Sequence, residues 1–300
     1  MLQNPKIIAP IFEWGSRTYV MGILNITPDS FSGDGLISDL AGCEHLPGFA
    51  LEQARRFVVA GASILDVGGE STRPGSVPVS ANEEATRVIP VIRTLAEEFP
   101  GFLISIDTYK AEVAQVAIEA GATIVNDVWG LRADAKMGAV VAQYDVPVIL
   151  MHNRSKPTNA AIEARLGGRY VGMQYDNLIE DVKRELMESV ALAHAAGIQD
   201  NKIILDPGIG FGKTVSQNLE LLNRLDEIKA LGYPVLLGPS RKSFIGYTLN
   251  LPPDQRVEGT AATIAVGIAR GADIVRVHDV EVMVRVVKMT DAIVRARILR

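Results

Sequence analysis

Three stretches of this chain share one pattern: Ala60-Gly-Ala-Ser-Ile-Leu-Asp66, Ala120-Gly-Ala-Thr-Ile-Val-Asn126 and Arg270-Gly-Ala-Asp-Ile-Val-Arg276. Each stretch follows a segment with helical spacing of apolar residues; these segments are Ala50–Val59, Ala111–Glu119 and Glu258–Ala269. Glycine takes the left-handed conformation at a helix end at little cost, and the β-branched run after it is typical of a buried strand. Each stretch therefore predicts a helix passing into a strand, with a polar residue at the strand's carboxyl end.

Apolar runs predict five further buried strands, at Tyr19–Leu24, Phe102–Ile106, Val146–Met151, Lys202–Leu205 and Pro234–Leu237. Helical patterns separate most of the strands, at Asn82–Glu98, Asp134–Gln143, Gln174–Ala196, Ser216–Ala230 and Val280–Arg297. Eight alternating units predict an α/β fold, the (β/α)8 TIM barrel, as one domain over residues 1–300. We expect Lys6–Arg17 to form a short β-hairpin that closes the bottom of the barrel. A doubly wound open sheet is the alternative, because the pattern alone does not show closure.

The composition narrows the class of protein. With 48% hydrophobic and 22% charged residues the chain can bury a large core, and its net charge of −5 argues against a predominantly nucleic-acid-binding surface. Cys43 is the only cysteine, which excludes a disulfide framework. The first residues lack a signal core, and no apolar run approaches the roughly 20 residues of a membrane span. We therefore expect a cytoplasmic protein with no membrane or nucleic-acid partner.

Polar residues follow every predicted strand, at the end of the barrel where active sites lie in this fold. Asp107, Asn126 and Asp206 offer mainly hydrogen-bond acceptors, which suit a flat nitrogen heterocycle with several N–H groups. The cationic residues after the second, seventh and eighth strands suit a phosphate instead; they are Arg73, Lys242, Arg276 and His278. The two groups together predict a neutral heterocycle joined to a phosphate or diphosphate.

The glycine-rich block Asp206-Pro-Gly-Ile-Gly-Phe-Gly-Lys-Thr214 looks at first like a phosphate-binding loop. The phosphate-loop pattern requires glycine where Pro207 stands, and the dinucleotide pattern requires glycine where Lys213 stands. We therefore interpret the block as a turn after the sixth strand, whose glycines let the backbone approach a flat ligand. Phe211 then becomes a candidate wall for an aromatic substrate.

Other polar residues have structural interpretations beside the functional ones. Asp66 and Glu70 are expected to form hydrogen bonds at the barrel mouth, and Asp127 to cap the segment after it. His152 fits a structural or a functional role equally. Met151 fits the core or a flexible thioether beneath a flat ring. No spacing of His, Asp and Glu predicts a zinc site.

The long motifs Met21–Ser32 and Leu65–Gly75 resemble signatures of the dihydropteroate synthase family. The resemblance covers the chain from about Arg17 onward and continues in order through Ser105–Lys110, Asn126–Gly130, Asp206–Thr214, Ser240–Gly246 and Arg256–Val280. It implies the condensation of a dihydropterin methyl diphosphate with 4-aminobenzoate, giving dihydropteroate and diphosphate in folate biosynthesis.

The resemblance also implies roles at matching positions. Asn25 would help hold the Mg2+ that binds the diphosphate. The implied pterin contacts are Asp107, Asn126, Met151, Asp206 and Lys242. The residues implied near the diphosphate are Thr72, Arg73, Arg276 and His278. The 4-aminobenzoate pocket, where sulfonamides compete in this family, would be lined by Pro74, Phe211 and Ser243. The family further implies a homodimer.

The expected chemistry is electrostatic. An aromatic amine is uncharged at neutral pH, so its attack on the pterin's methylene carbon needs no strong general base. We expect the carboxylates to stabilise positive charge spreading into the pterin ring, and the cations and Mg2+ to neutralise the leaving diphosphate. The expected catalytic residues are Asp107, Asp206, Lys242 and Arg276.

Two rival functions share the pterin-binding pattern: a methyltetrahydrofolate methyltransferase barrel, which has no need of the cationic cluster, and a pterin-binding protein without catalysis. Two segments depart from the family pattern. Ile37–Gly48 is interpreted as an insertion in the first loop, and Asn153–Gly172 as a long loop after the fifth strand.

Overall fold

Eight parallel strands form the main sheet of the molecule. The structure, a computed structural model, describes residues 12–27, 46–72, 76–171 and 173–295. The strands are β1 (Tyr19–Asn25), β2 (Ile64–Gly68), β3 (Leu103–Asp107), β4 (Ile124–Asp127), β5 (Val148–Met151), β8 (Ile203–Asp206), β9 (Leu236–Leu237) and β10 (Ile274–Val277). They pair in the order β8-β5-β4-β3-β2-β1-β10-β9.

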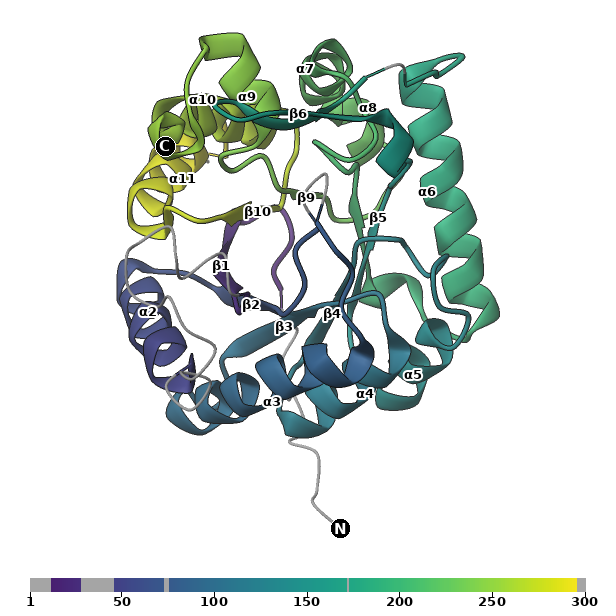
Figure 1. The fold of residues 1–300 in the computed structure, drawn as a ribbon, viewed down its shortest axis with the longest axis vertical. Helices are drawn as coiled ribbons and strands as arrows, with labels where there is room; N and C mark the ends of the chain where they lie inside the picture. Colours follow the sequence, from purple (N-terminus) through teal and green to yellow (C-terminus); the bar gives the residue numbers. More distant parts are fainter. Residues whose placement is uncertain (1–11, 28–45, 73–75, 172, 296–300) are drawn as a thin grey trace, which may run out of the picture.

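A parallel bridge between Leu205 and Val235 joins the two ends of this sheet, and the Leu205 N–H donates to the Pro234 carbonyl at 2.9 Å. The sheet is therefore closed into a barrel (Figure 1), which confirms the predicted fold and excludes the open doubly wound sheet.

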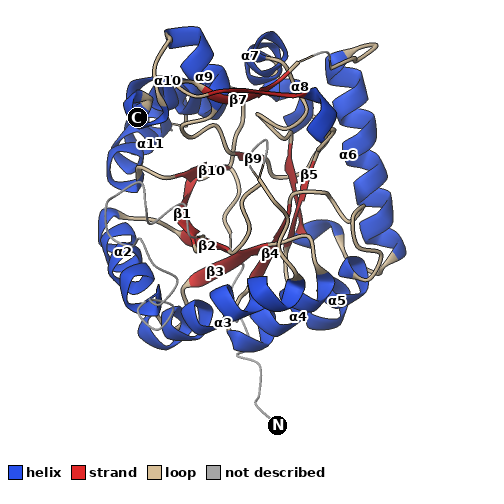
Figure 2. Ribbon diagram, in the orientation of Figure 1, coloured by secondary structure: helices blue, strands red, loops and turns tan. Residues whose placement is uncertain are grey.

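Helices surround the barrel (Figure 2). They are α2 (Leu46–Ala60), α3 (Ala81–Glu98), α4 (Ala111–Ala120), α5 (Met137–Tyr144), α6 (Leu178–Ala195), α7 (Val215–Asn223), α8 (Leu225–Lys229), α9 (Ser243–Leu249), α10 (Val257–Ala269) and α11 (Val280–Val294), with 3-10 turns at Pro157–Asn159, Asp200–Lys202 and Pro253–Gln255. The single helix expected over Ser216–Ala230 is two helices, because Arg224 leaves the helical conformation at φ −111° and ψ 27°.

The alternation of side chains along each strand separates an apolar floor from a polar mouth. The floor is a cluster of inward-facing residues: Tyr19, Met21, Ile64, Ile124, Ile149, Ile204, Leu236 and Ile274. Two positions further along five of these strands, the inward residues are Asp66, Asn126, Met151, Asp206 and Arg276. The residues between them face outward into the core under the helices, as Leu65 and Val275 do. The period of two thus carries the polar groups to the carboxyl end of the barrel.

The three repeated stretches behave as predicted. Their glycines, Gly61, Gly121 and Gly271, have φ values of 105°, 122° and 101°, which favour glycine. They follow the ends of α2, α4 and α10 and lead into β2, β4 and β10.

The floor of the barrel is covered by the segment before β1. Lys6–Ile11 of the expected hairpin lie outside the described residues, and residues 12–17 contain a turn without a strand. The Phe12 ring stacks on Trp14 with centroids 4.4 Å apart and meets the Tyr19 ring edge-on at 5.0 Å. The segment therefore closes the bottom of the barrel through aromatic packing.

The structure corrects part of what was expected for the two segments that depart from the family pattern. Helix α2 already begins at Leu46, so the last residues of the expected insertion Ile37–Gly48 belong to that helix, while residues 37–45, including Cys43, lie outside the described ranges. The expected long loop Asn153–Gly172 contains an antiparallel hairpin, β6 (Ala160–Glu163) and β7 (Gly167–Tyr170). Within the described part of the chain, no helix combines the length and apolar character of a membrane span.

Candidate active site

Arg276 lies at the centre of the polar mouth, between two carboxylates. Its Nε donates to Asp66 Oδ2 at 2.5 Å, and its Nη2 donates to Asp107 Oδ2 at 2.6 Å. The three side chains come from β10, β2 and β3, which the barrel brings together although Asp66 and Arg276 are 210 residues apart. Asn126 Nδ2 also lies 3.4 Å from Asp66 Oδ2. The structure thus assembles the predicted Asp107, Asn126 and Arg276 into one cluster, with Asp66 as the shared acceptor.

Burial shifts the charges of this cluster. It raises the pKa of Asp107 to about 7, against the lowering effect of Arg276 and with the help of the Asp66 carboxylate. Burial alone would lower the pKa of Arg276, but Asp66 and Asp107 outweigh it and raise that pKa. Arg276 therefore stays cationic, and a proton is more readily held at Asp107 than on an ordinary aspartate.

Asp206 ends β8 on the other side of the mouth. Burial raises its pKa, opposed by Lys242 and by the Gly208 N–H, which donates to Asp206 Oδ1 at 2.7 Å. Lys242 approaches from the loop before α9, where its Nζ donates to the Ile209 carbonyl and lies 4.5 Å from the centroid of the Phe211 ring. Burial lowers the pKa of Lys242 to about 8, opposed by Asp206. The predicted Asp206, Phe211 and Lys242 therefore form a second cluster.

The remaining predicted residues that the structure describes lie at strand ends, at the start of α9 or in the loops after the strands. Met151 is buried at the end of β5, and Ser243 is the first residue of α9. His278 is half-buried after β10, with its Nδ1 3.1 Å from Ser240 Oγ. Asn25 and Thr72 are half-buried at the ends of β1 and of the described part of the second loop. Arg73 and Pro74 lie outside the described residues.

Three structural interpretations are confirmed. Asp127 caps the segment after β4, with its two carboxylate oxygens accepting the N–H groups of Trp129 and Leu131 at 2.8 Å each. Glu70 forms hydrogen bonds at the mouth, where Tyr109 Oη donates to it at 2.9 Å and Lys110 Nζ pairs with it. The Asp66 bonds described above confirm its expected role as well.

Sequence reasoning missed a buried network behind the glycine-rich turn. Lys213 is buried and its Nζ lies 2.9 Å from His152 Nδ1, while His152 Nε2 lies 3.0 Å from Glu185 Oε2 on α6. His152 follows β5, Lys213 follows β8, and nothing in their spacing links them. The one signal was a lysine inside the block where the dinucleotide pattern requires a glycine.

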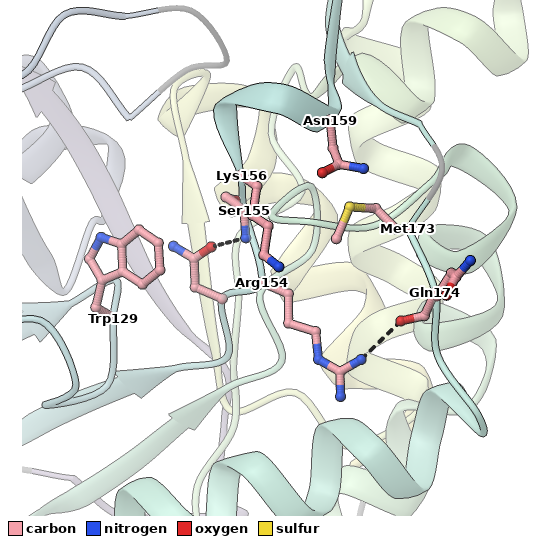
Figure 3. Close-up of a pocket in the computed structure, with 8 residues that line it drawn as sticks. Trp129, Arg154, Ser155, Lys156, Asn159, Met173 and Gln174 are labelled. Atoms are coloured by element: carbon pink, nitrogen blue, oxygen red, sulfur yellow. Dashed lines mark hydrogen bonds between the residues drawn. The ribbon is translucent and has the colours of Figure 1, made fainter.

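A cavity of 540 Å3 opens beside the mouth, on the side of α6 (Figure 3). Its lining residues are Trp129, Asn153, Arg154, Ser155, Lys156, Asn159, Met173 and Gln174, none of which the sequence selected. Arg154 Nη1 donates to the Gln174 carbonyl at 3.0 Å, and the Ser155 N–H donates to Asn153 Oδ1 at 2.8 Å. This cavity is bounded by the loop after β5 and is separate from the two clusters.

A metal site built by the protein alone is not evident. In the part of the chain that the structure describes, no group of three or more His, Cys, Asp or Glu side chains could hold a metal ion.

Comparisons with known proteins agree on one family. Residues 21–278 match the family model described as pterin binding enzyme. The chain is 50% identical over 291 residues to a dihydropteroate synthase of Clostridium beijerinckii, covering 97% of this chain and 99% of that one.

Two solved structures are similar throughout. A dihydropteroate synthase from Clostridium difficile, crystallised in the presence of pteroic acid, has a TM-score of 0.83 and 48% identity, with coverage of 95% of this chain and 100% of that chain. A Yersinia pestis dihydropteroate synthase with a sulfonamide drug complex has a TM-score of 0.82 and 41% identity, with coverage of 94% and 96%. The chain described here therefore belongs to the pterin-binding enzymes and, among them, to the dihydropteroate synthase family.

Proposed function

We propose that this protein transfers the dihydropterin methyl group from its diphosphate to the amine of 4-aminobenzoate, giving dihydropteroate and diphosphate. The observation that carries the proposal is the pairing of Arg276 with Asp66 and Asp107 at the barrel mouth, facing Asp206 and Lys242. A cation and several buried acceptors are thereby held together at the carboxyl end of the barrel. Such a site suits a heterocycle with N–H groups that carries an anionic leaving group.

The residues act by position and charge. The acceptors Asp107, Asn126 and Asp206 would hold the N–H edge of the pterin, and a ring lacking those groups would leave them unpaired. As the bond from the methylene carbon to the diphosphate oxygen breaks, positive charge spreads into the ring beside Asp107 and Asp206. Arg276 meets the opposite charge on the leaving group. The amine nitrogen then bonds to the methylene carbon and loses a proton to solvent. Groups of this kind typically change rates by about 10²–10³-fold each.

The mouth also fits the Mg2+ ion that the family implies. Gly68 has no side chain, and a Cβ atom there would lie 3.9 Å from Asn25 Oδ1 and 3.6 Å from Asp107 Oδ2. The absent side chain leaves a recess beside Asp107 Oδ2 and Asn25 Oδ1, and oxygen is the ligand that Mg2+ prefers. Asn25 would hold the ion, which supplies charge neutralisation for the diphosphate. The proposal is supported by this recess and is tested by titrating EDTA-treated protein with Mg2+ in the presence of diphosphate.

Phe211 and Ser243 are proposed to line the place of the second substrate. Phe211 supplies an aromatic face next to Lys242, and Ser243 begins α9 with its backbone at a helix N-terminus. Thr72, at the end of the described part of the second loop, is proposed to meet the diphosphate, as the resemblance implies.

A homodimer, as the family implies, is proposed for the assembled protein. Its support is that Val266 on α10 and Met289 and Ile293 on the neighbouring α11 are exposed apolar side chains, with exposed fractions of 45%, 64% and 67%. Sedimentation of the protein and of a Met289→Glu variant tests this. A cytoplasmic location stays a prediction.

The direct test mixes the purified protein with Mg2+, the pterin diphosphate and 4-aminobenzoate. We expect equal amounts of diphosphate and dihydropteroate, and inhibition by a sulfonamide that competes with 4-aminobenzoate. Pterin binding without release of diphosphate would instead support the non-catalytic alternative. Methyl transfer from methyltetrahydrofolate without dihydropteroate formation would support the methyltransferase.

A further inference from the structure

The ammonium group of Lys213 lies inside the turn that follows β8. The side chain belongs to a residue only 2% exposed, and its Nζ donates to the Gly208 carbonyl at 2.9 Å, the Phe211 carbonyl at 3.1 Å and His152 Nδ1 at 2.9 Å. An ammonium has three donors, and all three are used. None of the three acceptors is a carboxylate, so the buried charge is held by neutral groups. Burying a charge in this way is costly, whereas a methionine would fill the same space without that cost.

The turn itself is packed against the neighbouring strand end. Gly208, Gly210 and Gly212 all have positive φ, at 70°, 82° and 60°. In this conformation the Gly208 and Phe211 carbonyl groups both accept hydrogen bonds from Lys213 Nζ. A Cβ atom at Gly208 would lie 1.8 Å from the His152 carbonyl oxygen. The turn after β8 and the residue after β5 are therefore in direct contact, and Lys213 bonds to both.

The same turn carries Phe211 and contacts Lys242, the two residues assigned above to the substrate sites. The Ile209 carbonyl accepts from Lys242 Nζ, and the Phe211 ring lies 4.5 Å from that nitrogen. A Cβ atom at Gly210 would lie 2.7 Å from Lys242 Cδ, so the lysine stem rests on the turn backbone. Any displacement of the turn consequently moves Phe211 and Lys242 together.

Lys213 is connected to helix α6 through His152 and Glu185. Because an ammonium can only donate, His152 Nδ1 is the acceptor and His152 Nε2 carries the proton; Nε2 lies 3.0 Å from Glu185 Oε2. Burial lowers the pKa of His152 to about 3, reinforced by Lys213, so the ring is neutral as this arrangement requires. Glu185 in turn accepts from Arg154 Nε at 2.9 Å. The chain of contacts thus runs from the turn to a helix of the outer ring.

We propose that Lys213 is a positioning residue of the reaction: by bonding to the Gly208 and Phe211 carbonyls and to His152, it fixes the turn that places Phe211 and Lys242 against the substrates. The inference rests on the proposed function, because it assigns Phe211 to the 4-aminobenzoate side. Burial also lowers the pKa of Lys213 to about 7, which Asp206 opposes and Lys242 reinforces.

The test is a double-mutant cycle of Lys213→Met and Phe211→Ala, with both substrates varied. Lys213→Met is expected to raise the KM for 4-aminobenzoate about tenfold, because small displacements of positioning groups have effects of this order or larger. In the Phe211→Ala background the same substitution is expected to raise that KM by less than about twofold, since the wall it positions is already gone. Multiplicative effects of the two substitutions would overturn the proposal.

Lys229→Met is the matched control. Lys229 Nζ bonds to Asp273 at 2.7 Å and to the Tyr233 carbonyl at 3.3 Å, next to the amino ends of β9 and β10 and away from the turn. It is expected to lower thermal stability without changing the KM for 4-aminobenzoate. If Lys213→Met behaved as Lys229→Met does, its role would be structural only.

If Lys213→Met does not fold, two substitutions of His152 test the same hydrogen bond. His152→Asn retains an acceptor near Nδ1 and is expected to keep the KM for 4-aminobenzoate within about threefold, whereas His152→Leu removes the acceptor and is expected to raise it further. Equal effects of the two would contradict the positioning role. Wild-type turnover in the same assay separates this outcome from a failure of the proposed function, which would leave the wild-type protein itself inactive.

Discussion

Replacing Arg276 by methionine tests the central ion cluster. The guanidinium pairs with Asp66 and Asp107 at 2.5 and 2.6 Å, and the side chains are only 20%, 0% and 12% exposed, so solvent screens these pairs little. Removing one partner of a buried pair while leaving the other charges in place typically costs about 3–5 kcal/mol. We therefore expect Arg276→Met to lower the free energy of unfolding by about that amount at neutral pH. A second substitution, Asp107→Asn, should restore about 1 kcal/mol or more, because it removes one of the stranded charges.

Urea unfolding followed by fluorescence and circular dichroism measures this, at about pH 6 and about pH 8.5. Because the folded-state pKa of Asp107 is raised to about 7, this carboxyl destabilises the wild-type fold progressively as pH rises from its ordinary pKa to about 7. Loss of Arg276 raises the folded-state pKa further, so in Arg276→Met the loss of stability continues above about pH 7. The deficit of Arg276→Met should therefore be larger at the higher pH. Arg270→Met, at a 43% exposed arginine whose nearest carboxylate is Asp226 at 3.7 Å, is the control and should change stability by less than about 0.5 kcal/mol. An equal, small loss for both arginines would refute the buried cluster.

Three further predictions concern the mouth. Asp107→Ala should reduce kcat by about 10²-fold or more while the circular dichroism spectrum is retained, and near-wild-type turnover would exclude its role. The pKa of Lys242 is lowered to about 8, so its positive charge is lost as pH rises through about 8, and kcat/KM for the pterin diphosphate should decline with it. If the pH profile of Lys242→Gln kept the same decline, the decline would belong to another group. Gly208→Ala should abolish activity and lower stability by about 3 kcal/mol or more, because its Cβ would meet the His152 carbonyl, whereas Gly232→Ala, which has φ 92° and open space, should cost only about 1 kcal/mol. Similar losses at the two glycines would contradict the packing of the turn.

The fold was predictable because its signals are local. Each Gly-Ala stretch combines a helix end with a β-branched run, and the period of two then places Asp66, Asn126 and Arg276 at the mouth. The hairpin β6–β7 was not predictable in the same way. Its strands have four residues each and contain glycines such as Gly167, so they lack both alternation and β-branched enrichment.

The site was predictable as a set of residues but not as a set of bonds. Asp107, Asp206 and Arg276 could be identified because each lies at the carboxyl end of a predicted strand, and closure of a barrel brings all of these strand ends together. Which of them pair depends on distances that the sequence does not contain. The contact of Lys213 with His152 joins residues 61 positions apart on elements with no shared motif, and its importance appears only when the burial of the ammonium is known.

Ligand binding tests most directly the claim that the ring and the diphosphate are held by different residues. Dissociation constants would be measured for the bare pterin and for its methyl diphosphate, with Mg2+ present, on the wild type and on Asp206→Asn and His278→Gln. Asp206→Asn should weaken both ligands by a similar factor of about tenfold or more, because it alters the ring site. His278→Gln should weaken the diphosphate by about tenfold and leave the bare pterin unchanged. Equal weakening of both ligands by His278→Gln, or no effect of Asp206→Asn on the bare pterin, would contradict the account.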